Sequence, residues 1–224
     1  MKKTTVLFDM DNTLIDRVAA AQSMYRVIVK RALPDGSKED RQRMFDLMWE
    51  IDDNGDTPKA LVFGQAAKAF GLSDEWVRVQ TEEVWVKEFP LHTVLFEQAE
   101  TVLRTLQKYY KVGIITNGMS SVQKAKVKAA GLDKIVDMIL IGGDVGLRKP
   151  DPALYLEGCR RIGCLPEEAY YVGDNIPKDI YGSKAVGMTP VYIWRDDSIP
   201  CDLEGVPHIY KIEEVLEVIP CPSK

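Results

Sequence analysis

The chain has 224 residues, of which 46% are hydrophobic and 28% are charged, a composition typical of a folded globular protein with a full core. Its formal net charge is −5, which does not favour binding to nucleic acid polymers or to anionic membranes, because no excess of basic residues is available to neutralise phosphates. A phosphate-binding site would therefore need positive charge gathered locally, from a cation or from a few placed side chains.

The first predicted strand is 4–8, a short apolar and β-branched run of the kind found in buried parallel strands. Similar runs follow at 112–116, 136–141, 169–173 and 190–194, and 208–212 is a candidate edge strand. A helical pattern precedes each of the four later runs. These patterns are 102–109, 121–130, the segment that begins at Asp151-Pro152, and about Pro177 to Gly187. Serines stand at the start of 121–130, as expected for a helix cap. This alternation predicts a doubly wound, Rossmann-like α/β fold with a mostly parallel sheet of five to six strands.

Residues 16–91 interrupt this alternation, because no convincing strand appears there. The predicted helices in this segment are 18–32, 39–51, 58–70 and 74–88, separated by turn-forming residues. Trp49, Trp76 and Trp85 fall inside these helices, and we expect them to pack in a shared core. The sequence thus predicts two domains, an α/β core made of 1–15 and 92–224 and a helical-bundle domain of 16–91 inserted after the first strand.

Nothing in the sequence predicts export or membrane insertion. The first apolar run meets Asp9 at once, whereas a signal peptide needs a longer apolar core, and no segment approaches a membrane-spanning length. Cys159, Cys164, Cys201 and Cys221 form no Cys-x-x-Cys pair and no zinc-like cluster with histidine. We therefore expect a cytoplasmic protein with free thiols.

The candidate functional residues follow the predicted strands, where ligands bind in open parallel sheets. Asp9 and Asp11 follow the first strand, Thr116 and Asn117 end the second, and Asp174 ends the fourth. Because the carboxyl ends of parallel strands meet at one edge of the sheet, we expect these side chains to converge on one crevice. Lys149 follows the third strand, and Asp179 lies in the first turn of a later helix.

Each of these signals has a plain structural interpretation when taken alone. Asp9 and Asp11 could be two solvated acids in a turn, Lys149 a solvated surface lysine, and Asp179 a partner of the helix dipole. A calcium loop is excluded, because Leu14 and Ala20 stand where that loop needs glycine and glutamate. Two carboxylates at a strand end can instead flank one phosphorus atom, so that one attacks while the other protonates the leaving oxygen.

Four segments in this order resemble the motifs of the haloacid dehalogenase superfamily. They are Asp9-Met10-Asp11-Asn12-Thr13-Leu14, Thr116-Asn117-Gly118, Lys149-Pro150-Asp151-Pro152 and the run from Gly173-Asp174 to Asp179. The helical insertion after the first motif matches the position of the cap in members that have helical caps. The resemblance implies a phosphatase, because dehalogenases of the superfamily lack the second aspartate of the first motif.

The resemblance also implies a role for each matched residue. Asp9 would be the nucleophile, and Asp11 the general acid and then the general base. Thr116 would bind the transferring phosphoryl group together with Asn117, and Lys149 would neutralise charge on the nucleophile and on the phosphoryl oxygens.

A magnesium ion is implied as the cofactor. The carboxylates of Asp9 and Asp174 and the backbone carbonyl of Asp11 would bind Mg²⁺, and Asp179 would support the site through water or Lys149. The expected activity is hydrolysis of a phosphomonoester through an aspartyl-phosphate, on a small phosphorylated metabolite.

The identity of the substrate stays open at this point. Gln123 and Lys126, downstream of Thr116-Asn117-Gly118, resemble the nucleoside monophosphatase branch, while phosphoglycolate and N-acylneuraminate phosphatases are similar in the same segments. A phosphomutase would retain every motif, and a non-catalytic binding or regulatory protein on the same scaffold is a further alternative. Arg17, at the start of the insertion, is interpreted as a solvated side chain rather than as a substrate contact. The sequence predicts no oligomeric state.

Overall fold

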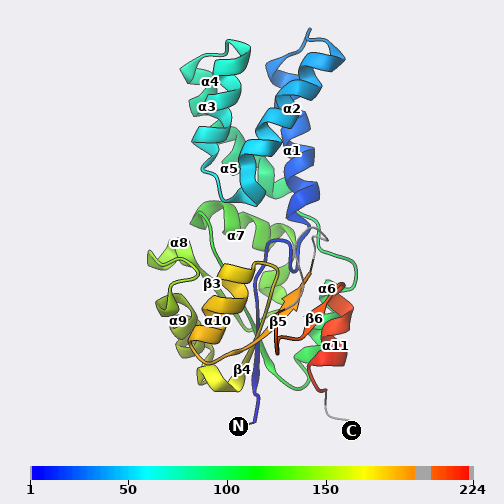
Figure 1. Ribbon diagram of the computed structural model, residues 1–224, viewed down its shortest axis with the longest axis vertical. Helices are drawn as coiled ribbons and strands as arrows, with labels where there is room; N and C mark the ends of the chain where they lie inside the picture. The colour runs from blue at the N-terminus through cyan, green and yellow to red at the C-terminus, as the bar shows by residue number, and fades with distance from the viewer. Residues whose placement is uncertain (1, 195–202, 222–224) are drawn as a thin grey trace. The chain divides into compact units, whose positions relative to one another are not determined.

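The computed structural model describes residues 2–194 and 203–221. Its internal contacts divide the chain into two compact units, one made of Met1–Asp16 with Val94–Lys224 and the other of Arg17–Thr93. The first is an α/β core and the second is helical, and Figure 1 shows the helices and strands of both.

The core contains a six-stranded parallel sheet in the order β3-β2-β1-β4-β5-β6. The strands are β1 (Thr5–Phe8), β2 (Lys111–Thr116), β3 (Met138–Ile141), β4 (Ala169–Gly173), β5 (Thr189–Ile193) and β6 (His208–Ile209). This topology confirms the predicted doubly wound α/β fold, including the short edge strand. The strand order reverses direction at β1, which places the end of β1 at the position where such sheets bind ligands.

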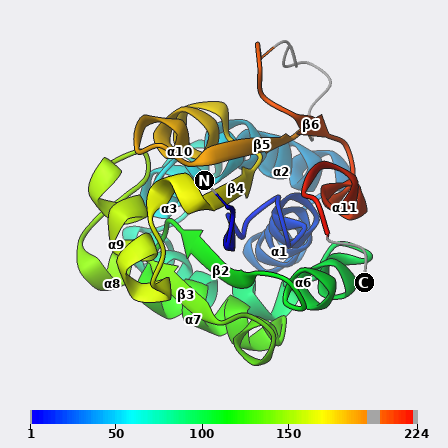
Figure 2. The same ribbon diagram turned by 90° about the horizontal axis from the view of Figure 1, so that it is seen from below.

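Helices cover both faces of the sheet, as the view in Figure 2 shows. Val6 and Phe8 of β1 pack on one face with residues of α6 and α11, whereas Leu7 points to the other face and packs with α9. This alternation is the period of two expected of a strand buried on both sides. The core helices are α6 (Ala99–Leu106), α7 (Ser120–Ala129), α8 (Gly142–Val145), α9 (Pro152–Ile162), α10 (Gly182–Ala185) and α11 (Val215–Val218).

Three helix boundaries in the core test the sequence predictions. Asp151 caps α9 as predicted, since its carboxylate accepts a hydrogen bond from the Ala153 amide at 2.9 Å. The serine cap expected for α7 is wrong, because the residue before the helix is Met119 and Ser120 donates its hydroxyl proton to Asp144 instead. Helix α6 starts three residues earlier than predicted, because Ala99 belongs to its buried stripe.

Short turns of helix connect these elements. They are the 3₁₀ turns Leu132–Lys134, Pro166–Glu168 and Ile212–Glu214, and the π-helical turn Ile176–Tyr181 before α10. The π turn supplies one of the acidic side chains discussed below.

The helical unit contains the four predicted helices, the last of them broken by a π-helical turn. Its elements are α1 (Arg17–Ala32), α2 (Lys38–Asp52), α3 (Lys59–Phe70), α4 (Asp74–Val79), the π turn Gln80–Val84 and α5 (Trp85–Glu88), with 3₁₀ turns at Asp53–Gly55 and Phe89–His92. The predicted aromatic core is present. The ring of Trp85 lies 5.3 Å from Tyr25 and 6.0 Å from Phe63, and Phe63 also contacts Trp76 while Tyr25 contacts Trp49.

Among the described residues, no helix combines the length and the apolar character that crossing a bilayer requires. Cys159, Cys164 and Cys221 are free thiols, as expected, and Cys201 lies outside the described residues.

Candidate active site

Asp9 lies at the centre of an acidic cluster at the carboxyl end of the sheet. It directly follows β1, and its amide donates a hydrogen bond to the carbonyl of Val172 in the adjacent strand β4 at 2.9 Å. Asp174 follows β4, so the parallel pairing brings both acids to the same edge. Carboxylate oxygens of Asp9, Asp174 and Asp179 lie within 4.8 Å of one another.

Asp179 reaches this cluster from the π-helical turn that follows β4. The side chain is fully buried, and one of its carboxylate oxygens accepts a hydrogen bond from the Asn175 amide at 3.0 Å. A Cβ atom at Gly173 would lie 2.4 Å from the carboxyl carbon of Asp179, so only glycine at this position allows so close an approach. Asp179 therefore belongs to the acidic cluster and is more than a partner of the helix dipole.

Lys149 provides the positive charge of the cluster. Its ammonium donates hydrogen bonds to Asp9 Oδ1 at 2.6 Å, to Asp179 Oδ1 at 2.7 Å and to the Tyr171 hydroxyl at 3.2 Å. The residue is only 3% exposed, which excludes the interpretation of a solvated surface lysine. Tyr171, in β4, in turn donates its proton to the carbonyl of Ile115 in β2 at 2.9 Å, so the hydroxyl that accepts from the ammonium is itself held in place.

The side chain of Asn117 fixes the backbone of Lys149. Its carbonyl oxygen accepts a hydrogen bond from the Lys149 amide at 2.7 Å, and its amide donates to the Lys149 carbonyl at 3.1 Å. Thr116, at the end of β2, is buried, and its hydroxyl accepts a hydrogen bond from the Gln123 amide at 2.9 Å. The Asn117 side chain is thus engaged within the protein, while the Thr116 hydroxyl lies beside the residues that hold Asp11.

Two residues of α7 hold the Asp11 carboxylate. The Gln123 amide donates to Asp11 Oδ2 at 2.9 Å, and the buried ammonium of Lys126 forms an ion pair with Asp11 Oδ1. From the sequence, Gln123 and Lys126 indicated only a branch of the superfamily, and neither their contacts with Asp11 nor the role of Tyr171 was predicted. A useful signal was available, since Gln123 and Lys126 are spaced three apart and lie on the buried face of α7.

The electrostatics of the cluster follow from burial and an imbalance of charge. Burial is the largest effect on Asp9 and, with repulsion from Asp179, raises its pKa to about 7 against the opposing attraction of Lys149. Burial and the same acidic neighbours hold the pKa of Asp174 well above its usual range. Burial alone would lower the pKa of Lys149, but Asp179 and Asp9 outweigh it and hold that pKa well above the ordinary value.

This donor set fits a hard divalent cation. The carboxylates of Asp9, Asp174 and Asp179 lie close together, and the Lys149 ammonium pairs with two of them, Asp9 and Asp179. These three acids and Lys149 together carry an excess of two negative charges when all are ionised. Oxygen ligands without histidine or cysteine are the set that Mg²⁺ prefers, and a dication would neutralise the excess. Asp9 and Asp174 are therefore suited to hold Mg²⁺.

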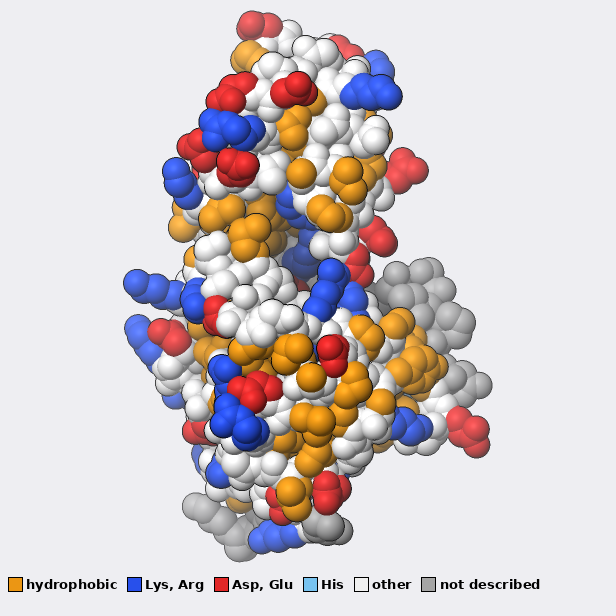
Figure 3. Space-filling model, turned by 90° about the vertical axis from the view of Figure 1, so that its left-hand side faces the viewer, with side chains coloured by type: hydrophobic (Ala, Val, Ile, Leu, Met, Phe, Trp, Pro, Cys, Tyr) orange, Lys and Arg blue, Asp and Glu red, His pale blue; other side chains and the backbone are white. Residues whose placement is uncertain are grey.

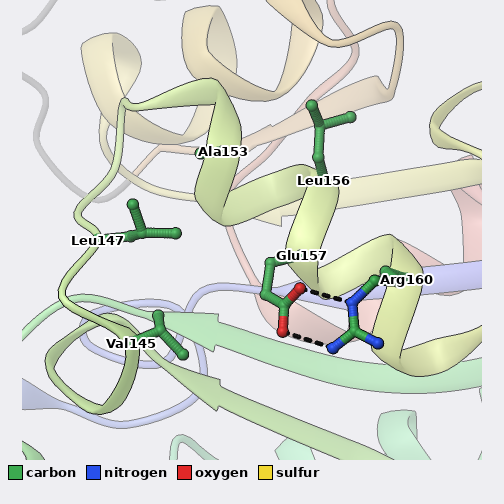
Figure 4. A pocket seen from close by; sticks show the side chains of 6 residues that line it. All are labelled: Val145, Leu147, Ala153, Leu156, Glu157 and Arg160. Atoms are coloured by element: carbon green, nitrogen blue, oxygen red, sulfur yellow. Dashed lines mark hydrogen bonds and ion pairs between the residues drawn. The ribbon is translucent and has the colours of Figure 1, made fainter.

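A depression lies on another part of the core, between α8 and α9. It is lined by Val145, Leu147, Ala153, Leu156, Glu157 and Arg160 (Figure 4). Glu157 is paired with Arg160 at 2.7 Å, and the remaining lining is apolar. Figure 3 views the side of the molecule on which α8 and α9 lie in Figure 1, and it shows apolar side chains gathered on this face of the core. None of the predicted site residues lines this depression.

A parallel sheet with an acidic pair after its central strand, a buried lysine and a second acidic cluster defines an α/β enzyme of the haloacid dehalogenase type. The chain belongs to the haloacid dehalogenase-like hydrolase family, whose model matches residues 6–193.

Two curated relatives are phosphatases. The chain is 27% identical to the glyceraldehyde 3-phosphate phosphatase of Methanopyrus kandleri, over 96% of each chain. It is 25% identical to the N-acylneuraminate-9-phosphatase of Mus musculus, covering 95% of this chain and 91% of the relative. With the family match, these relatives identify the chain as a phosphatase of this superfamily, a phosphoric monoester hydrolase.

A solved structure shows the same fold. A HAD-hydrolase from Bacillus subtilis superposes with a TM-score of 0.77 over 97% of this chain and 99% of that one, at 22% identity, and is described as bound to magnesium. Magnesium is the metal generally used in this superfamily, and the buried aspartates of this chain form a cluster that could bind one.

Proposed function

We propose that the chain hydrolyses phosphomonoesters of small metabolites through an aspartyl-phosphate formed on Asp9. The observation that carries this proposal is the fixed position of the Asp9 carboxylate. Its Oδ1 atom lies 2.6 Å from the Lys149 ammonium, and Asp9 directly follows β1, the strand where the sheet order reverses. A carboxylate held in this way can attack with its other oxygen without losing orientation to rotation.

In the first step, an oxygen of Asp9 attacks the phosphorus atom, and the bond from phosphorus to the leaving oxygen breaks. Protonated Asp11 passes its proton to that oxygen, so that the alcohol leaves as a neutral molecule. The ammonium of Lys149 and the hydroxyl of Thr116 stabilise charge on the phosphoryl oxygens, which carry most of it in a loose transition state.

In the second step, Asp11 reverses its role. A water molecule attacks the phosphorus of the aspartyl-phosphate, and the carboxylate of Asp11 accepts the proton that the water loses. The bond between phosphorus and the Asp9 oxygen breaks, which releases inorganic phosphate and restores Asp9. Gln123 and Lys126 keep the Asp11 carboxylate in one place through both steps, because each of its oxygens has a partner on α7.

We propose Mg²⁺ as the cofactor. The carboxylates of Asp9 and Asp174 and the backbone carbonyl of Asp11 would hold the ion, with Asp179 supporting them through Lys149. When bound, the ion supplies positive charge that relieves repulsion between an anionic nucleophile and an anionic substrate.

The substrate is proposed to be a small phosphorylated metabolite. The curated relatives are named for glyceraldehyde 3-phosphate and for a 9-phosphate of N-acylneuraminate, both esters of small carbon skeletons. Nucleoside monophosphates remain within the proposal, on the resemblance of Gln123 and Lys126 to that branch. We also propose that residues 16–91 act as the cap domain of a core made of 1–15 and 92–224, and that the protein works in the cytoplasm.

The test is release of inorganic phosphate from a panel of phosphomonoesters with Mg²⁺ present. The panel contains p-nitrophenyl phosphate, glyceraldehyde 3-phosphate, phosphoglycolate, sugar phosphates and nucleoside monophosphates. We expect phosphate release from at least one of them, and failure on all would refute the proposed activity. Hexose 1-phosphates are included with chromatography of the sugar products, because an isomerised sugar phosphate without free phosphate would identify a phosphomutase instead.

A further inference from the structure

Two cysteines of the α/β core meet where helix α9 ends. Gly163 stops the helix with a backbone φ of +74°, in the left-handed region that glycine tolerates best. The Gly163 amide donates a hydrogen bond to the carbonyl of Cys159 at 2.8 Å, and the next amide, of Cys164, donates to the same carbonyl at 3.1 Å. At a helix end of this kind, the side chains of the two residues that flank the turn commonly contact each other. Here both of these side chains are thiols.

The two thiols are in contact and differ in exposure. They are hydrogen-bonded to each other, Cys159 belongs to the apolar cluster between α9 and the sheet, and Cys164 packs against this cluster. Cys159 is only 3% exposed, whereas Cys164 is half-buried and is therefore open to small solutes. A disulfide needs Cα atoms that lie within about 7 Å of each other, and the backbone hydrogen bond keeps these two residues close. Closing the bond therefore requires movement of the side chains rather than of the helix.

The surroundings of the pair assign a different role to each sulfur. The hydrogen bond from Cys159 is the largest effect on Cys164, and with a hydrogen bond from Thr5 and the charge of Lys111 it lowers the pKa of Cys164 to about 7, against burial and the charge of Glu168. The same hydrogen bond between the thiols, together with burial, raises the pKa of Cys159. Cys164 is thus the sulfur that becomes a nucleophilic thiolate, and Cys159 is the neighbour that can react with its oxidised form.

The pair lies at the edge of the sheet opposite to the acidic cluster. The Lys111 ammonium is held beside the helix end by hydrogen bonds to the carbonyls of Ile162 at 2.9 Å and Gly163 at 3.3 Å. Lys111 begins β2, and Thr5 begins β1, whereas Asp9 follows the other end of β1. The chemistry of these thiols is therefore separate from that of the candidate active site and does not rest on the proposed phosphatase function.

We propose that Cys159 and Cys164 form a peroxide-reactive site that closes reversibly to an intramolecular disulfide. In the first step, the Cys164 thiolate attacks one oxygen of hydrogen peroxide and the O–O bond breaks. The departing hydroxide takes a proton from solvent and becomes water, which leaves a sulfenic acid on Cys164. In the second step, the sulfur of Cys159 attacks the sulfur of Cys164, and the thiol proton leaves with the hydroxyl group as a second water. The two sulfurs are oxidised, and one peroxide is reduced to two waters.

The test is peptide mapping of the full chain after exposure to hydrogen peroxide. The folded protein is treated at low concentration, remaining thiols are blocked with N-ethylmaleimide in guanidinium chloride, and the chain is digested with trypsin. Arg160 and Arg161 lie between the two cysteines, so trypsin separates their peptides unless a disulfide joins them. We expect mass spectrometry to find the Cys159 and Cys164 peptides linked, and the link to be lost when dithiothreitol is added before blocking.

The outcomes that overturn the proposal are distinct in the same experiment. Recovery of both cysteines as maleimide adducts after peroxide treatment would show that the pair does not react. A bond from either of them to another cysteine of the chain, or to a second chain, would show that the contact at the end of α9 does not direct the oxidation. Circular dichroism of the treated sample confirms that the mapped protein is still folded.

Two variants separate the roles of the sulfurs, and a third is the matched control. In Cys159→Ser, the second thiol is missing, so Cys164 is expected to accumulate as a sulfenic acid that dimedone traps. In Cys164→Ser, Cys159 is expected to stay reduced, because it is buried. Cys221→Ser removes a partly exposed thiol outside the pair and is expected to keep the wild-type disulfide.

The variants also decide which cysteine reacts first. If Cys159→Ser does not fold, Cys164→Ser decides, since its substitution is at the more exposed position. Oxidation of Cys159 in folded Cys164→Ser at the wild-type rate would overturn the assignment of Cys164 as the attacking sulfur. Loss of the linked peptides in Cys221→Ser would overturn the pairing itself.

Discussion

Lys126 of α7 forms an ion pair with Asp11, and the two side chains are unequally exposed. The lysine side chain is 2% exposed and the aspartate side chain is 23% exposed, so the cation is anchored inside the core while the carboxylate keeps access to solvent. An acid that must lose a proton in one step and regain it in the next needs this kind of access. In the proposed mechanism, the buried ammonium would stabilise the anionic form of Asp11 that remains after the leaving group has been protonated.

We predict that Lys126→Met lowers kcat for p-nitrophenyl phosphate by about tenfold to a hundredfold, the range expected for loss of one charged hydrogen bond. The KM value is expected to change less, because Lys126 contacts Asp11 rather than the phosphoryl group. Lys124→Met is the control, since Lys124 lies on the same helix with an exposed side chain that pairs with Asp144. Equal kcat values for the two variants would refute the role of Lys126.

We predict that Asp9→Asn abolishes phosphate release while the fold stays intact, because an amide cannot form the acyl phosphate. Phosphate release is measured with p-nitrophenyl phosphate, and the fold is checked by circular dichroism. Turnover at the wild-type rate would contradict the assignment of Asp9 as the nucleophile.

Asp9 should also govern how the stability of the metal-free protein depends on pH. Burial raises its pKa from 3.8 to about 7, so the folded state keeps a proton that the unfolded state has already lost within this window. Stability therefore falls as pH rises from about 4 to about 7. Urea unfolding in EDTA should show this fall in the wild type and a smaller fall in Asp9→Asn. If the free energy of unfolding depended on pH equally in both proteins, burial and the neighbouring acids would not be raising the pKa of Asp9.

The sequence could predict the main acidic positions, because they depend on local patterns. Asp9 and Asp174 each end an apolar strand, and parallel pairing of adjacent strands then brings them together. The burial of Lys149 was harder to predict, because it depends on two contacts. Asn117 holds the backbone of Lys149, and Asp179 approaches the ammonium over Gly173. These contacts come from tertiary packing that no local pattern records.

Arg17 is a second residue whose burial could not be predicted from the local sequence. It is only 6% exposed, so its interpretation as a solvated side chain is wrong. At the start of a helix, an arginine is most often solvated, and nothing near it in the sequence suggests otherwise. Its partner Asp52 is 35 residues away, and the loop that lies against its guanidinium is made possible by Gly55. Burial of Arg17 therefore results from how α1, α2 and α3 pack, which periodicity alone does not specify.

We predict that Mg²⁺ stabilises the wild-type chain and is required for its activity. A dication offsets the two excess negative charges of the cluster, so adding Mg²⁺ should raise the melting temperature, and EDTA should remove phosphate release. Asp174→Asn should lose most of the melting-temperature gain, because it removes one of the carboxylates. Asp144→Asn is the control for a general effect of charge, since its carboxylate pairs with Lys124. An equal gain in both variants would refute the metal role of Asp174.

Asp52 should be essential for the stability of the helical unit. We predict that Asp52→Asn destabilises this unit by about 3–5 kcal/mol, because it leaves the buried charges of Arg17 and Lys59 without a counter-ion. Urea unfolding can be followed by tryptophan fluorescence, since three of the four tryptophans lie in this unit, at Trp49, Trp76 and Trp85.

Asp46→Asn provides the comparison for Asp52→Asn, because Asp46 is an exposed residue of the same helix, and its loss should cost much less stability. The pH dependence gives a second check. Burial would raise the pKa of Asp52, but the charges of Arg17 and Lys59 outweigh it and hold this pKa below 3.8. The folded state then binds fewer protons than the unfolded state in acid, so the contribution of Asp52 is present above the unfolded pKa and is lost as pH falls through the lowered value. The stability difference between wild type and Asp52→Asn should therefore shrink in strong acid. A difference that stays constant there would show that the carboxylate is not held ionised by its two cations.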